Sequence, residues 1–81
     1  MKPKYDMVCV KELQWRSAVQ VGYRCRILDF KSDDDVLGEI VAVEFERHIN
    51  GHNAPTFPGA KGKDGHCIYF DSEDMNHLKF I

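Results

Sequence analysis

Four residues in the second half of the chain carry the nitrogen and sulfur atoms that bind metals: His48, His52, His66 and Cys67. If the loop between them folds back, the four side chains can converge on one zinc ion. The spacing argues against this, because adjacent residues such as His66 and Cys67 point to opposite faces of a strand. We therefore predict no metal and no other cofactor, with Cys67 in the core and the histidines hydrogen-bonded to loop backbone. A zinc-stabilised interaction module is kept as an alternative.

Cysteine next to histidine also suggests covalent catalysis. A nucleophilic thiolate needs a nearby base and a partly exposed, electropositive setting, and the only such sign is His66 beside Cys67. The cysteines are Cys9, Cys25 and Cys67. They are odd in number and lie inside apolar runs, so they are expected to be reduced and buried. We predict no catalytic residues and no enzyme.

Three consecutive aspartates, Asp33, Asp34 and Asp35, are the densest acidic run. They lack the alternating oxygen ligands, the central glycine and the terminal glutamate of a calcium loop, so a solvated acidic turn is expected there. The net charge of the chain is -2, which gives little attraction for nucleic acid or an anionic membrane. No run is apolar enough for a signal peptide or a membrane span, and we expect a cytoplasmic protein.

The elements that must position these residues are short hydrophobic runs separated by turn formers, as in small β-proteins. With 81 residues the chain is expected to form one domain, 1–81. Strands are predicted at 7–10, 21–29, 38–47, 67–70 and 78–81, with an ordered loop at 11–20, a solvated turn at 30–37 and one helical turn at 71–76 begun by Asp71 or Ser72.

Alternation assigns faces to the two long strands. Core-facing positions are predicted to be Val21, Tyr23, Cys25 and Ile27 in one strand and Val41, Val43 and Phe45 in the other. Their outward neighbours, Arg24 and Arg26 against Glu44 and Glu46, are expected to pair across the strands. The glycine- and proline-rich segment 48–64 is long for so small a domain, and such loops are often functional.

Five short strands, a long first loop and one helical turn before the last strand resemble an SH3-like barrel. The segments VGYRCRI, GEIVAVEFE, GHN and KDGHCIYF are similar to a class of small uncharacterised bacteriophage proteins with that presumed fold, loosely over 7–81 and more closely over 38–81. Two features depart from that pattern: Ile68 and Tyr69 stand where an aromatic pair is expected, and 13–20 contains Trp15. The resemblance implies an accessory, phage-encoded protein.

These patterns favour a non-catalytic protein that binds another protein of the host or the phage, possible roles being the inhibition of a host enzyme or defence system. Trp15, Phe57 and Tyr69 are candidate aromatic anchors, although Trp15 can equally be a lid on the core. The candidate binding residues are Trp15, Asp33, Asp34, Asp35, His52, Phe57, Lys61, Lys63 and Tyr69. The alternative is a nucleic-acid-binding barrel that uses Arg24, Arg26 and Lys31, or Lys61 and Lys63, with Phe57 or Tyr69 as stacking platforms. The protein is expected to be a monomer or a homodimer.

Overall fold

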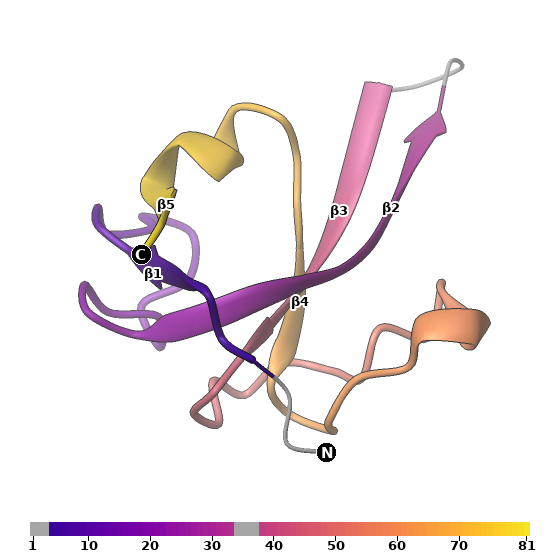
Figure 1. Cartoon of the computed structure of the whole chain (residues 1–81), viewed down its shortest axis with the longest axis horizontal. Helices are drawn as coiled ribbons and strands as arrows, with labels where there is room; N and C mark the ends of the chain where they lie inside the picture. The colour runs from indigo at the N-terminus through magenta and orange to yellow at the C-terminus, as the bar shows by residue number, and fades with distance from the viewer. Residues whose placement is uncertain (1–3, 34–37) are drawn as a thin grey trace.

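The computed structural model describes residues 4–33 and 38–81, and its main element is one antiparallel sheet (Figure 1). The elements, in chain order, are the strands β1 (Met7–Cys9), β2 (Arg24–Asp33) and β3 (Gly38–Phe45), the 3-10 turn η1 (Pro58–Ala60), the strand β4 (Cys67–Phe70), the 3-10 turn η2 (Asp74–His77) and the strand β5 (Leu78–Phe80). The prediction of a mainly β-protein with five strands and little helix is confirmed.

The strands lie side by side in the order β4-β3-β2-β1-β5, and every neighbouring pair is antiparallel. The last strand therefore does not follow its predecessor in the sheet but crosses to the far side, where it pairs with β1. Among the described residues β5 has no hydrogen-bonded partner other than β1, so the sheet is open rather than closed by the last strand as expected.

β2 begins at Arg24 and ends at Asp33, later at both ends than the predicted 21–29, and it carries an irregularity near its middle. The residue pairs along β2 and β3 run from Cys25–Phe45 to Ile27–Val43, and then resume at Asp29–Ala42. Leu28 is thus an extra residue, a β-bulge, and it reverses the faces of every later side chain in β2. Alternation alone does not reveal a bulge. The turn predicted at 30–37 from the aspartate run was wrong for Phe30 to Asp33, which continue the strand.

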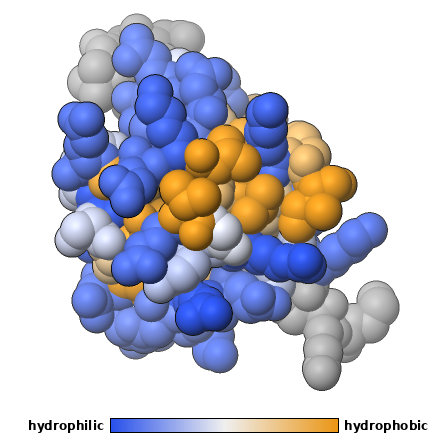
Figure 2. Space-filling model, turned by 90° about the vertical axis from the view of Figure 1, so that its left-hand side faces the viewer, coloured by the Kyte–Doolittle hydropathy of each residue, from blue (hydrophilic) through white to orange (hydrophobic). Residues whose placement is uncertain are grey.

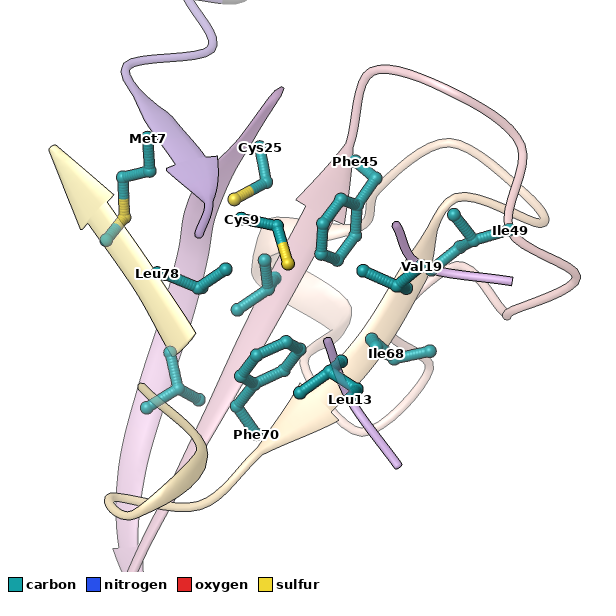
Figure 3. Packing of buried hydrophobic residues seen from close by; sticks show 12 residues of the cluster. Met7, Cys9, Leu13, Val19, Cys25, Phe45, Ile49, Ile68, Phe70 and Leu78 are labelled. Carbon is teal, nitrogen blue, oxygen red and sulfur yellow. The ribbon is translucent and has the colours of Figure 1, made fainter. Parts of the chain in front are cut away.

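On one face of the sheet, side chains of the strands pack with side chains of two loops (Figure 3). Twelve buried residues form this first cluster: Met7, Cys9, Leu13, Val19, Cys25, Val41, Val43, Phe45, Ile49, Ile68, Phe70 and Leu78. The ordered loop predicted at 11–20 supplies Leu13 and Val19, and its backbone closes turns from Leu13 to Arg16 and from Arg16 to Val19. The loop is therefore part of the core, which explains its order without regular structure.

Two residues predicted to face the core are exposed. Val21 lies in the turn before β2 and is 56% exposed, while Ile27 pairs with buried Val43 yet remains 39% exposed. Ile27 lines a shallow groove with Met7 and Phe80 and is therefore open to solvent on one side. The core-facing assignments of Cys25, Val41, Val43 and Phe45 are confirmed.

The opposite face of the sheet is also covered, which the sequence did not predict. Ala42 and Cys67 pack there against Ala54 and Phe57 from the long loop, and Leu28, Ile40, Ala60 and Tyr69 border this second cluster. An isolated β-bridge between His52 and Cys67 fixes the loop on the outer edge of β4. The segment 48–64 was expected to be a functional loop, but its first part is committed to the core: Ile49 lies in the first cluster, and Ala54 and Phe57 lie in the second.

The last helical turn is shorter than predicted and begins later. η2 starts at Asp74, whose backbone N–H donates to the Asp71 carboxylate at 2.8 Å, while the Asp71 N–H approaches the Asp74 carboxylate at 3.4 Å. This reciprocal arrangement satisfies backbone donors in the way a helix cap does. Of the two predicted starting residues, Asp71 holds the turn.

Replacing Phe57 by Ala should destabilise the protein by about 3 kcal/mol, because a buried phenyl ring leaves a cavity when it is removed. Phe57 is only 6% exposed and packs in the second cluster. Thr56→Ala, at the exposed neighbouring position, should change the free energy of unfolding by less than about 0.5 kcal/mol. Urea denaturation of both variants measures the difference; equal stability of the two would contradict a packed loop.

Candidate functional site

The predicted binding residues do not form one surface, because they lie on opposite faces of β4. Trp15 contacts Phe70, whereas His52 and Phe57 contact Tyr69. Tyr69 and Phe70 are adjacent in the strand, so their side chains point to opposite faces of the sheet. Asp33 is the last residue of β2, and Asp34 and Asp35 lie outside the described residues.

The first group of predicted binding residues, His52 and Phe57, lies around Tyr69. The His52 ring lies 4.4 Å from it and the Phe57 ring 5.8 Å, between ring centroids, and the Tyr69 hydroxyl accepts the Thr56 N–H at 2.9 Å. The prediction that Phe57 is an exposed anchor or stacking platform was wrong, because the ring is buried and the Lys31 ammonium lies 5.8 Å from its centroid. This aromatic group holds the loop against the sheet; Lys61 and Lys63 remain exposed beside it.

The histidines are occupied by local contacts. Two of them accept backbone N–H groups two residues later through their Nδ1 atoms: His48 from Asn50 at 3.3 Å and His52 from Ala54 at 2.9 Å. His66 Nδ1 lies 2.9 Å from the Phe45 carbonyl oxygen, which can only accept, so this nitrogen carries the proton. Burial, and then the charge of Arg16, lower the pKa of His52 and favour its neutral form.

Metal ligands do not converge in the parts of the chain that the structure describes. Within residues 4–33 and 38–81, no three side chains of His, Cys, Asp or Glu are grouped closely enough to hold one ion. His48 and His66 do approach each other, with ring centroids 5.6 Å apart, but Cys67 lies in the second cluster with Phe57. A zinc site on the four predicted residues therefore has no geometric support here.

The thiols are buried and protonated at neutral pH. Burial raises the pKa of Cys25 to about 12 and that of Cys67 to about 11, and it raises the pKa of Cys9 as well. A thiol with such a pKa is a poor nucleophile. Cys67 faces the Lys63 carbonyl oxygen at 3.6 Å, a contact typical of a structural cysteine.

A buried carboxylate, that of Glu44, was predicted to point outward but is only 2% exposed. It accepts hydrogen bonds from the Tyr5 hydroxyl at 2.8 Å, the Arg26 Nε at 2.9 Å and the Lys63 backbone N–H at 2.8 Å. The expected cross-strand pair of Arg26 and Glu44 is confirmed. Sequence reasoning missed the burial because the covering residues come from the N-terminal segment and the long loop, both distant in sequence.

The Glu44 group joins three segments and supplies a structural site rather than a reactive one. Burial by itself raises the pKa of a carboxyl group, but the hydrogen bonds from Arg26, Lys63 and Tyr5 outweigh this effect and lower the pKa of Glu44. Tyr5 responds in the opposite sense: burial and the Glu44 carboxylate raise its pKa to about 12. The network is satisfied internally and leaves no oxygen of Glu44 free for a ligand.

Trp15, on the other face of β4, is partly open to solvent. Trp15 is 49% exposed, stands edge-on to Phe70 with ring centroids 5.9 Å apart, and donates its Nε1–H to the Asp74 carboxylate at 3.2 Å. It therefore serves partly as the lid that was one of its two predicted roles, yet half of its surface stays available. Two contacts from separate elements fix the ring.

A groove of about 250 Å³ lies beside Trp15, between the first loop and η2. It is lined by Lys11, Glu12, Gln14, Trp15, Asp74 and His77. The His77 Nδ1 lies 3.2 Å from the Lys11 carbonyl oxygen and 3.1 Å from that of Glu12, so it donates to the loop and fixes the width of the groove. We call this surface the Trp15 groove.

Sequence reasoning found Trp15 but missed the other residues of the groove. Asp74 and His77 are about sixty residues away in sequence, and only the crossing of β5 to β1 brings η2 to the first loop. The sequence signal that could have found them is the polar composition of 71–77, which we interpreted only as evidence for a helical turn.

Comparisons with protein-family models, with curated proteins and with solved structures find no match for this chain. Over the described residues, no helix combines the length and the apolar character that crossing a membrane requires. The case for function therefore depends on the geometry of the chain itself.

Replacing Glu44 by Gln should destabilise the protein by roughly 2–3 kcal/mol at pH 7, because charged hydrogen bonds to Arg26 and Lys63 are weakened. The folded pKa lies below the unfolded value of about 4.3, so the contribution of the ionised carboxylate is complete above that pH and is lost as the pH falls through the folded pKa.

Thermal melts of the native protein and Glu44→Gln between pH 7 and about pH 2 measure this contribution. Their stabilities should converge on acidification. Glu46→Gln, at the exposed position directly after β3, is the matched control and should melt like the native protein at every pH. A constant difference between native protein and Glu44→Gln across the whole range would contradict the assignment.

Proposed function

We propose that this chain is a non-catalytic binding protein that recognises another protein through the Trp15 groove. The observation that carries the proposal is the half-exposed Trp15 ring, held by Phe70 and Asp74 at the edge of a groove. Tryptophan is among the residues that dominate the energy of protein interfaces, and a ring fixed beforehand loses little entropy on binding.

The charge around the groove indicates the kind of segment it accepts. Acidic side chains outnumber the single lysine at its rim, because Glu12 and Asp74 line it and Asp71 and Glu73 are exposed in the adjoining turn. A partner segment that places an apolar side chain on Trp15 and a basic side chain against these carboxylates matches the groove in both respects.

The proposal includes the fold family, an SH3-like barrel. An SH3-like barrel is supported by the strand order β4-β3-β2-β1-β5, by the long loop between β1 and β2 and by the 3-10 turn directly before β5. Such barrels bind proteins, peptides or nucleic acids in different cases. The fold is therefore compatible with protein binding but does not distinguish it from the other functions. The half-exposed Trp15 ring in its groove favours protein binding among these functions.

The resemblance to bacteriophage proteins suggests where such a binding protein would act. A phage-encoded protein of this size, acting in the host cytoplasm, would inhibit a host enzyme or defence system by covering part of its surface. The absence of a reactive thiol or a metal-binding group among the described residues supports a mechanism based on occupancy rather than on chemistry. The loop 48–57, which is packed against the sheet, is no longer part of the proposed recognition surface.

The nucleic-acid alternative receives less support from the geometry. One of its two stacking platforms, Phe57, is buried, and the ring of the other, Tyr69, is packed between His52 and Phe57. Arg26, one of its cations, is engaged by Glu44. A base could therefore stack on neither ring without opening the second cluster.

Trp15→Ala should weaken the binding of a partner captured from bacterial extract by about 30-fold or more, the effect of losing a central aromatic anchor. Trp15→Phe, which keeps a ring against Phe70, should retain most of the affinity. Isothermal titration with the purified partner measures both, and thermal melts verify that each variant is folded.

Lys61→Ala and Lys63→Ala serve as matched controls because both lysines are exposed in the long loop. They should bind normally, and binding should persist at about 0.5 M salt, at which phosphate contacts are largely lost. If instead the lysine variants failed to bind while Trp15→Ala bound fully, the long loop rather than the Trp15 groove would be the recognition surface.

A further inference from the structure

A second exposed surface lies on the core-facing side of the sheet, beyond the reach of the covering loops. Ile27 and Phe30 share this side although they are three residues apart, because the bulge at Leu28 shifts the register between them. Their partners in β3, Val43 and Val41, are both buried. The bulge therefore presents two large apolar side chains side by side along β2.

Phe80 of β5 extends this surface across the sheet. It pairs with Met7, which pairs in turn with Cys25 beside Ile27, and Ile27, Phe80 and Met7 line one shallow groove. Ile27 is 39% exposed, Phe30 60% and Phe80 70%. Figure 2 looks onto the side of the molecule where β1 and β5 lie, and shows hydrophobic side chains gathered across the middle of that face. We call Ile27, Phe30 and Phe80 the apolar patch.

The charges around the apolar patch are balanced. Lys4, Asp6 and Arg26 complete the lining of the groove, and Arg26 is already paired with Glu44, which leaves one charge of each sign. A rim of one sign would favour a partner of the opposite sign and would repel its own copy. A rim with both signs can face itself across a two-fold axis, with Lys4 of one copy against Asp6 of the other.

The area of the apolar patch also fits a second copy. From the exposed fractions, the three side chains offer roughly 300 Å² of apolar surface, taking about 200 Å² for a large side chain. Two copies would bury about 600 Å² of apolar surface, and with the usual polar share the interface reaches about 1,000 Å², which is the lower limit for a specific interface. We propose that the protein forms a two-fold symmetric dimer through Ile27, Phe30 and Phe80.

The dimer is independent of the Trp15 groove, because no residue of the apolar patch lines that groove. A dimer would present two Trp15 grooves, so a partner with two binding segments would be held more tightly than either groove alone allows. The small core of an 81-residue chain would gain stability by mass action from the association.

Sedimentation equilibrium of the native protein from about 1 µM to about 1 mM should show a monomer–dimer equilibrium, and its melting temperature should rise with concentration. Phe30→Asp and Phe80→Asp should each raise the dissociation constant by about tenfold or more, because each places an unpaired charge in an apolar contact. Val21→Asp, at another exposed apolar position, should dimerise like the native protein.

Melting at the lowest concentration, where the monomer dominates, verifies that the aspartate variants are folded. A native protein that stays monomeric over the whole range would overturn the proposal and leave the apolar patch to a different protein. Dimers that persist unchanged in both Phe30→Asp and Phe80→Asp would overturn it as well, since the copies would then meet elsewhere.

Discussion

The burial of β3 on both of its faces is the constraint on which the rest of the structure depends. Val41, Val43 and Phe45 face one cluster, while Ala42 and Glu44 face the other. A single sheet of this size cannot bury both faces by itself, so loops must cover them: the first loop and Ile49 cover one face, and the rest of the long loop covers the other. Loops that would otherwise be free for recognition are thereby committed to the core.

The same constraint explains which surfaces remain available. After the loops have covered β3, Trp15 is left at the margin of one cluster, and β2 beyond its bulge is left without a cover. The candidate surfaces are therefore places where the covering layer ends. The Glu44 network fits this account, because its three donors fasten the N-terminal segment, β2 and the long loop to one buried carboxylate.

Local patterns predicted the strands well, because alternation and turn formers are properties of neighbouring residues. β4 was located to the residue and β1 nearly so. The failures share a cause: the burial of Phe57, the burial of Glu44 and the exposure of Ile27 depend on which distant segment lies above each residue. Trp15 was recognised as a candidate from its type, but Asp74 and His77 join it only through the strand order, which no local pattern encodes.

The bulge at Leu28 has a consequence for how related chains could diverge. Because the pairs resume at Asp29–Ala42, the bulge absorbs one residue of β2, and losing Leu28 would leave every later pair and the face of its side chain unchanged. Losing a second residue would leave no bulge to absorb it, and the side chains beyond that point would change faces. One residue is therefore expected to be gained or lost at the bulge without altering the surface of the outer arm, whereas a further single change would exchange its two faces.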